Sequence, residues 1–230
     1  MHSSAHYRQL LARLPQIAVA ADQFQVLNSA KDFKSRILSL IAGATQRIYL
    51  IALYLQDDEA GREILSALYA AKQRNPALDI KVFVDFHRAQ RGLIGKGKQG
   101  GNHLMYQAMA ARHEHQIEIY GVPVKGRELL GVLHLKGFIF DDILLYSGAS
   151  LNDIYLHQQE RYRFDRYHQI HSQALTRSMV NYVDDVFLKS EAVQRLDRPG
   201  IPGAKQLKGQ IRRFKHNLRT SQYRFESIPA

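Results

Sequence analysis

Two periods of hydrophobic residues alternate along the chain. Apolar runs rich in β-branched and aromatic residues predict strands at 24–27, 47–55, 79–86 and 117–123, and two more within 132–152. Apolar residues spaced three and four apart predict helices at 30–42, 59–75, 104–114, 172–190 and 205–223. This alternation predicts an α/β fold, in which a mixed β-sheet is flanked by helices.

Local signals mark where several of these elements begin and end. Ser29 is the expected N-cap of the first helix, and the Asn75–Pro76 pair is expected to end the second. The stretch 195–203 contains two prolines and two glycines and is expected to be a linker. We therefore predict a domain over 1–196, followed over 197–230 by a linker and a basic amphipathic helix.

That last helix has two distinct faces. Its apolar stripe has spacings of four, three and four and consists of Leu207, Ile211, Phe214 and Leu218. A basic flank runs alongside the stripe and consists of Lys205, Lys208, Arg212, Lys215 and Arg219. Such a helix packs on the core, contacts an anionic membrane surface, or does both if the stripe docks and the charges face lipid.

Composition narrows the classes of protein that fit. The 230 residues, 45% of them hydrophobic, suffice for one full core, and the absence of cysteine excludes disulfides and thiolate zinc sites. The apolar run 48–55 is too short to span a bilayer, and the first residues lack the apolar region of a secretory signal. A net charge of +11 predicts anionic partners: nucleic acid, lipid headgroups or phosphorylated small molecules.

The glycine-rich basic loop 91–101 resembles nucleotide-binding loops only superficially. It contains G-x-G-x-x-G and G-x-x-x-x-G-K spacings, but Gln99 stands where a P-loop needs serine or threonine. Neither pattern leaves a strand and opens directly onto a helix. The better interpretation is a basic loop in which Arg88, Arg91 and Lys98 are candidate contacts for substrate phosphates.

No metal site is predicted. The histidine pairs at 113 and 115 and at 168 and 171 lack the spacing, with a nearby carboxylate, of zinc proteases. The acidic clusters at 57–59 and 184–185 are expected to be charges at helix starts or on solvated faces. We expect neither a metal nor another cofactor.

His134 and Lys136 are unusual polar residues at the start of an apolar run. In a strand, residues two apart point to the same face, so both side chains are expected to point the same way. A neutral imidazole is a nucleophile for phosphorus, and a nearby ammonium group binds phosphate oxygens. Gly137 leaves room for a ligand, and Asp141 at the strand end can orient another group.

Further polar residues follow at fixed spacing. The pattern H-x-K-x4-D is followed, after six intervening residues, by G-x-x-x-N, which ends at Asn152. This pattern resembles the HKD signature of the phospholipase D superfamily. The usual second part is G-S-x-x-N, whereas here Ala149 takes the serine position and Ser150 follows it.

A more specific resemblance covers almost the whole chain. The stretches 47–76, 79–92, 120–158 and 161–170 are similar to the N-terminal half of the bacterial phosphatidylserine synthases of that superfamily. The resemblance implies a phospholipase D-like half-domain and transfer of a phosphatidyl group from CDP-diacylglycerol to L-serine, with release of CMP and no metal. It also implies a cytoplasmic protein, peripheral on the inner face of the bacterial membrane.

Roles follow from the resemblance residue by residue. His134 corresponds to the nucleophile that forms a phosphatidyl-histidine intermediate, and Lys136 to the residue that binds the transferred phosphoryl group. Asp141 corresponds to a residue that supports the site, and Asn152 to a hydrogen-bond donor to phosphate. Ser150 joins these candidates, together with Arg88 and Arg91 from the residues alone.

The chain departs from this family in having one HKD motif where the family has two. It is therefore expected to be a fragment that needs a second HKD half, a homodimer that pairs two copies of His134, or an inactive remnant. The fragment is the favoured expectation. The alternative functions are a homodimeric single-motif phosphodiesterase or nuclease, and non-catalytic binding of polyanions such as nucleic acid.

Overall fold

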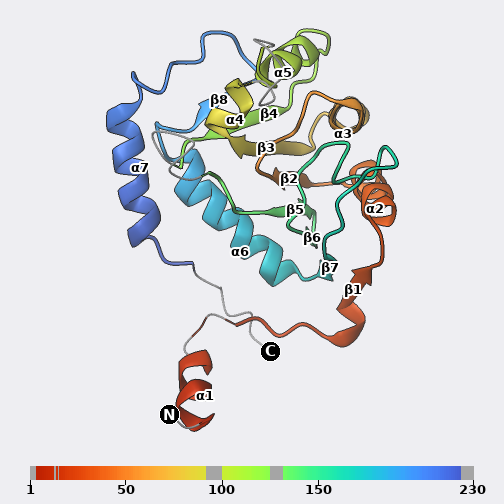
Figure 1. Ribbon diagram of the computed structural model, residues 1–230, viewed down its shortest axis with the longest axis vertical. Coiled ribbons are helices and arrows are strands. Elements are labelled where there is room, and N and C mark those ends of the chain that lie inside the picture. The colour runs from red at the N-terminus through yellow and green to blue at the C-terminus, as the bar shows by residue number, and fades with distance from the viewer. Residues whose placement is uncertain (1–3, 13, 15, 92–99, 125–131, 224–230) are drawn as a thin grey trace.

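A single mixed sheet of eight strands organises the chain in the computed structural model, which describes residues 4–12, 14, 16–91, 100–124 and 132–223 (Figure 1). The strands are β1 (Phe24–Leu27), β2 (Arg47–Ile51), β3 (Asp79–Asp85), β4 (Glu118–Val122), β5 (Gly137–Phe140), β6 (Ile143–Tyr146), β7 (Tyr167–His171) and β8 (Gln194–Arg195). Their order across the sheet is β1-β7-β6-β5-β2-β3-β4-β8. The pairs β2–β3 and β3–β4 are parallel and the others antiparallel, which confirms the predicted α/β fold with a mixed sheet.

Helices cover this sheet on both faces (Figure 1). They are α1 (Ser4–Ala12), α2 (Ala30–Gly43), α3 (Glu59–Arg74), α4 (Phe86–Gln90), α5 (His103–Ala110), α6 (Gln173–Val183) and α7 (Lys208–Thr220). Helix α6 continues into a π-helical turn over Asp184–Leu188, and α1 extends away from the rest of the chain. No described helix is long and apolar enough to cross a membrane.

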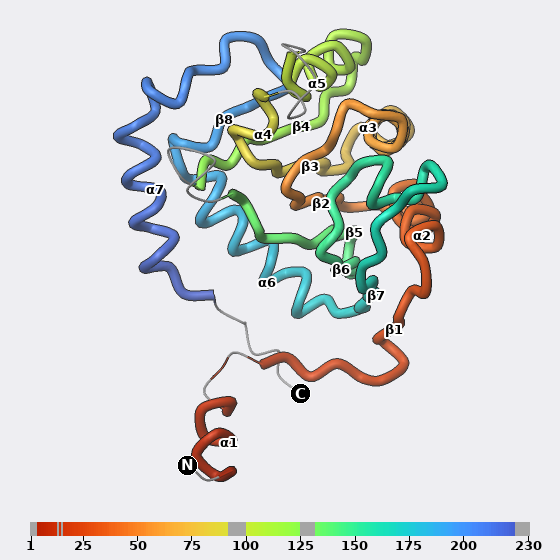
Figure 2. Tube along the Cα trace, in the orientation of Figure 1, coloured from red at the N-terminus to blue at the C-terminus, as the bar shows by residue number. Residues whose placement is uncertain are grey.

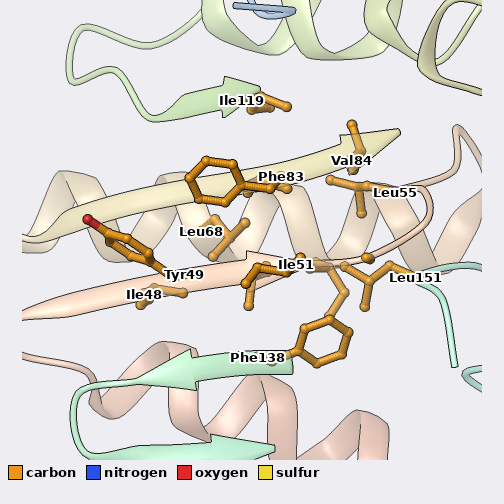
Figure 3. Packing of buried hydrophobic residues seen from close by; sticks show 14 of the residues in the cluster. Ile48, Tyr49, Ile51, Leu55, Leu68, Phe83, Val84, Ile119, Phe138 and Leu151 are labelled. Atoms are coloured by element: carbon orange, nitrogen blue, oxygen red, sulfur yellow. The ribbon is translucent and has the colours of Figure 1, made fainter. Parts of the chain in front are cut away.

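Strand β5 shows how the two faces are filled. Phe138 stacks on Phe33 of α2, with ring centroids 5.9 Å apart. The preceding residue, Gly137, faces α6, because a Cβ added there would lie 2.6 Å from the Cε of Met179. Gly137 also has a φ of +157°, so both packing and backbone conformation favour glycine. The central strands are buried from both sides as a result (Figure 3).

The predicted N-cap Ser29 is confirmed, and of the two alternatives for the acidic cluster 57–59 the structure shows a helix start. The side chain of Ser29 accepts a hydrogen bond from the backbone N–H of Asp32 at the start of α2. Asp58, from the acidic cluster expected at a helix start, accepts one from the N–H of Gly61 at the start of α3. Local sequence thus determines where these two helices begin.

The strands differ from the prediction at four elements, β2, β5, β7 and β8. Strand β2 ends at Ile51, four residues early, and strands β7 and β8 were not predicted. Strand β5 begins at Gly137, so His134 and Lys136 precede the strand rather than lying in it. The reason is that Gly137 pairs with the last residue of β2, and beyond that point Leu55 bridges to Leu151 instead.

Helix α7 runs along the outside of the chain (Figure 2), and its apolar stripe packs on the core. Leu207, Ile211 and Phe214 are buried, and the Phe214 ring lies edge-on to Phe187, with centroids 6.0 Å apart. The basic flank stays at the surface, where Arg212 and other cations are exposed. The expectation that the stripe packs on the core is therefore confirmed.

Asp141 holds the turn between β5 and β6 against the start of β2. Its carboxylate accepts hydrogen bonds from the backbone N–H groups of Thr45, Gln46 and Arg47 and from the Thr45 hydroxyl, at 2.8 to 3.1 Å. Burial by itself raises the pKa of Asp141, but these hydrogen bonds outweigh burial and hold the pKa below its ordinary value. Its φ of +50° is a conformation that aspartate and asparagine tolerate better than most residues.

We predict that Asp141→Asn destabilises the fold by about 1 to 2 kcal/mol, because the amide nitrogen cannot accept two of the four hydrogen bonds. Since the pKa of Asp141 is lowered on folding, its contribution is present above the unfolded pKa and is lost as pH falls through the folded pKa. The variant should therefore lose less stability than the wild type on acidification below about pH 4. Urea unfolding at pH 7 and pH 3 measures both effects; equal stability at pH 7 contradicts them.

Candidate active site

Most of the predicted site residues lie at one edge of the sheet. Strands β2, β3 and β6 end there, while β5 and β7, which run the opposite way, begin there. The segments that meet at this edge therefore follow Ile51, Asp85 and Tyr146 and precede Gly137 and Tyr167. In open α/β sheets this edge, at the carboxyl ends of the parallel strands, is where ligands bind.

His134 and Lys136 lie at this edge, immediately before β5. His134 is exposed, so its imidazole is open to a ligand, while Lys136 is half-buried. Burial lowers the pKa of Lys136 below its ordinary value, and the negative charge of Asp165 partly opposes that shift. The ammonium group is thus held in surroundings of reduced polarity, where its attraction for a phosphate is stronger than in water.

Asp165 connects Lys136 to the second part of the motif. Its carboxylate accepts hydrogen bonds from the backbone N–H of Arg166 at 2.7 Å and, more weakly, of Gly148 at 3.4 Å. A Cβ added at Gly148 would lie 2.7 Å from the Asp165 carboxylate. Glycine at the start of G-x-x-x-N therefore lets the turn approach the acidic neighbour of Lys136, a residue that sequence reasoning missed.

Asn152 is buried at the end of that turn. Its side-chain oxygen accepts a hydrogen bond from the N–H of Tyr155 at 3.0 Å, and its amide nitrogen lies 3.5 Å from the Tyr54 hydroxyl. Ala149 and Ser150 are buried as well. The turn thus brings Asn152 to the edge that carries the HKD pair, while its contact with phosphate stays a prediction.

Two carboxyl groups join the end of this turn to the start of α3. Asp58 accepts a hydrogen bond from the backbone N–H of Asp153, whose own carboxylate accepts one from the N–H of Ala60. Burial, together with the neighbouring Asp153 charge, raises the pKa of Asp58 to about 6 even though backbone hydrogen bonds oppose the rise. The residue after Asn152 is thereby tied to the start of α3.

A buried aspartate positions the segment that carries His134. Asp85, at the end of β3, is fully buried and accepts hydrogen bonds from the backbone N–H groups of His87 and Arg88 through one oxygen. Its other oxygen accepts one from the N–H of Leu133, at 3.0 Å. Sequence reasoning missed Asp85; the available signal was an acidic residue directly after a buried strand.

The two predicted arginines lie at different depths. Arg88 is half-buried on α4, and its guanidinium carbon lies 5.2 Å from the ring centroid of Tyr54, beside Asn152. Arg91 is exposed at the base of the glycine-rich loop, where it bridges to Gly100. Residues 92–99 of that loop, including Lys98, lie outside the described residues.

An apolar cavity of about 480 Å³ opens beside His134. Its walls come from the segment before β5, from the end of β2, from α6 and the π-helical turn, and from the end of α7. The lining residues include Ile51, Leu133, Leu135, Met179 and Leu218. A group with hydrocarbon character therefore has a place next to the imidazole.

Asp141 is not part of this edge. It lies at the opposite end of β5, and its carboxylate is bonded to residues 45–47, as described above. The placement favours indirect support, in which Asp141 fixes β5 and thereby the segment that precedes it. Contact between Asp141 and a bound phosphate is not what the structure favours.

Comparisons with known proteins agree with the predicted resemblance. The chain is 45% identical to a CDP-diacylglycerol–serine O-phosphatidyltransferase of Escherichia coli, over 96% of this chain and 49% of that protein. It is 47% identical to the enzyme of the same name from Haemophilus influenzae, over 91% of this chain and 47% of that protein. No family model matches the chain.

A solved structure gives the same result. The crystal structure of phosphatidylserine synthase from Haemophilus influenzae superposes with a TM-score of 0.93 at 43% identity, and covers 99% of this chain and 51% of that one. The predicted fold and the predicted resemblance to phosphatidylserine synthases are both confirmed. The chain spans about half the length of the relatives it matches.

We predict that Asp165→Asn lowers the pKa of Lys136 further, because the Asp165 charge is the attraction that opposes the effect of burial. Titration of the lysine side-chain resonances by nuclear magnetic resonance measures this pKa directly and needs no substrate. Asp22→Asn, at an exposed carboxylate on another part of the chain, is the matched control. An unchanged Lys136 pKa in Asp165→Asn contradicts the assignment.

Proposed function

We propose that this chain is one catalytic half of a CDP-diacylglycerol–serine O-phosphatidyltransferase, associated with the cytoplasmic face of a bacterial membrane. The observation that carries the proposal is the identity of 45% and 47% to two such enzymes over nearly all of this chain. The exposed His134 beside the half-buried Lys136 supports it, because that pair suits covalent phosphoryl transfer.

The proposed reaction has two steps. In the first, the neutral imidazole of His134 attacks the phosphorus next to diacylglycerol, a nitrogen–phosphorus bond forms, and the bond to CMP breaks with its electron pair leaving on CMP. Lys136 and Asn152 bind the phosphoryl oxygens as charge builds up on them. In the second, a base removes the serine hydroxyl proton, the oxygen attacks phosphorus, and the electron pair returns to His134.

The second step requires a base, and this chain has no second HKD motif to supply it. We propose that a second HKD half supplies the base, whether it belongs to the same longer protein or to another copy of this chain. The match to about half of each relative supports the first arrangement. The exposure of His134 supports both, since a second half can approach it from solvent.

Two surfaces support a lipid substrate. The apolar cavity beside His134 suits the hydrocarbon part of diacylglycerol, which must lie next to the attacked phosphorus. The outer side of α7 carries the exposed cations Lys208, Arg212 and Arg219, which suit anionic headgroups. Together they suit a substrate that is drawn from a membrane surface.

We predict that His134→Ala lowers phosphatidylserine formation more than about a thousandfold, because the nucleophile is lost. The assay follows labelled serine into lipid in CDP-diacylglycerol micelles, using the chain and a hybrid in which it replaces the matching half of the Haemophilus influenzae synthase. His171→Ala, at an exposed histidine where β7 ends, is the control. A folded hybrid that forms no phosphatidylserine, or a fully active His134→Ala hybrid, contradicts the proposal.

We further predict that Arg212→Gln with Arg219→Gln weakens binding to vesicles rich in anionic lipid by about fivefold for each residue. Vesicle co-sedimentation measures this, and binding to uncharged phosphatidylcholine vesicles should not change. Lys31→Gln with Arg112→Gln, at exposed cations elsewhere, is the matched control. Equal weakening by both pairs would show that net charge, rather than α7, is responsible.

A further inference from the structure

Asn152 contacts two tyrosines, and each of them has an arginine beside its ring. The Tyr54 hydroxyl lies 3.5 Å from the amide nitrogen of Asn152, and the Arg88 guanidinium lies over the Tyr54 ring. Arg88 is further placed by its backbone N–H, which bonds to Asp85. Because the same Asp85 carboxylate holds Leu133, Arg88 and the His134 segment keep a constant relation to each other.

The second arginine reaches Asn152 through a different tyrosine. The guanidinium carbon of Arg163 lies 5.6 Å from the ring centroid of Tyr155, and its Nη1 donates a hydrogen bond to the Tyr155 hydroxyl at 3.3 Å. The backbone N–H of Tyr155 in turn bonds to the Asn152 side chain. The Arg163 backbone is fixed as well, since its N–H bonds to the carbonyl of Ile154 at 2.9 Å.

Both cations act on the same hydroxyl group. Burial raises the pKa of the Tyr54 phenol, with a further rise from Tyr155, and the positive charges of Arg88 and Arg163 oppose that rise. Arg88 lies over the Tyr54 ring, and the charge of Arg163, beside Tyr155, also acts on the Tyr54 hydroxyl. In each contact the face of a tyrosine ring lies beside the guanidinium plane and helps to hold it in place.

We infer that Arg88, Arg163 and Tyr54 form a subsite for the second phosphate of a nucleoside diphosphate lipid, the phosphate that leaves as part of CMP. The inference rests on the proposed function, in which His134, Lys136 and Asn152 take the other phosphate. A pyrophosphate substrate presents two adjacent anionic groups, and the HKD pair accounts for one of them. Asn152 contacts both tyrosines that lie beside these arginines, so in the proposed site it adjoins the second phosphate as well as the first.

The subsite gives the leaving group a defined partner. When the bond between phosphorus and the bridging oxygen breaks, the electron pair and a negative charge remain on CMP. Two guanidinium groups bound to that phosphate in the subsite stabilise this charge. The same groups distinguish a nucleotide-activated lipid from an ordinary phosphodiester lipid, which has no second phosphate.

The test measures equilibrium binding of CMP, cytidine and inorganic phosphate to the chain itself by isothermal titration calorimetry. We expect CMP to bind at least tenfold more tightly than cytidine, because the arginines engage its phosphate. Arg163→Gln and Arg88→Gln should each weaken CMP binding about tenfold and leave cytidine unchanged. Arg163→Lys, which keeps the charge without the fork, should restore only part of the affinity.

Arg161→Gln is the matched control, since this arginine is exposed two residues from Arg163. Equal affinity for CMP and cytidine, no measurable binding of CMP, or equal effects of Arg161→Gln and Arg163→Gln would each overturn the inference. Inorganic phosphate that binds as tightly as CMP and is equally sensitive to Arg163→Gln would overturn the assignment to a nucleotide.

Failure of this inference and failure of the proposed function give different results. Exchange of labelled serine into phosphatidylserine needs the HKD chemistry but no second phosphate, so in the unsubstituted protein it tests the proposed function independently of the subsite. If serine exchange occurs but Arg163→Gln leaves CMP binding unchanged, the subsite is refuted and the proposed function stands. If CMP binding depends on the arginines but neither the chain nor the hybrid transfers a phosphatidyl group to serine, the proposed function is refuted and the subsite stands.

Discussion

The candidate site depends on one buried carboxylate. Asp85 is fully buried at the end of β3 and is bonded to the backbone N–H groups of His87, Arg88 and Leu133. A buried carboxylate is costly unless its oxygens are satisfied, so these three donors must stay in place. Because Leu133 directly precedes His134, the solvation requirement of one aspartate fixes where the nucleophile candidate lies relative to α4.

Partial burial also affects the cations at this edge of the sheet. Lys136 is half-buried, which lowers its pKa, and Asp165 supplies the negative charge that opposes the shift. Tyr54 supports the Arg88 guanidinium with its ring. Cations held in this way are attracted to a phosphate more strongly than fully solvated ones, since the surrounding dielectric is lower. The edge of the sheet therefore suits two adjacent anionic groups, and its apolar cavity suits a hydrocarbon group beside them.

Much of the fold could be predicted because it follows local rules. Ser29 caps α2, the apolar stripe of α7 docks, and His134, Lys136 and Asn152 were found through fixed spacing. The limit of β5 could not be predicted, because it depends on the register with β2, which ends at Ile51. Asp141 was expected to orient another group and support the site, but the partners of its carboxylate, residues 45–47, lie about ninety-five positions earlier in the chain and could not be predicted.

By itself, then, the sequence determined the element types, the HKD pattern and the basic surface, since periodicity, spacing and charge act over a few residues. Only the tertiary structure decided which residues support the pattern. Asp85 meets Leu133 across 48 positions, and Tyr54 meets Asn152 across 98. Such contacts arise because parallel and antiparallel strands bring distant segments to one edge of the sheet, an arrangement set by strand order and not by any local stretch.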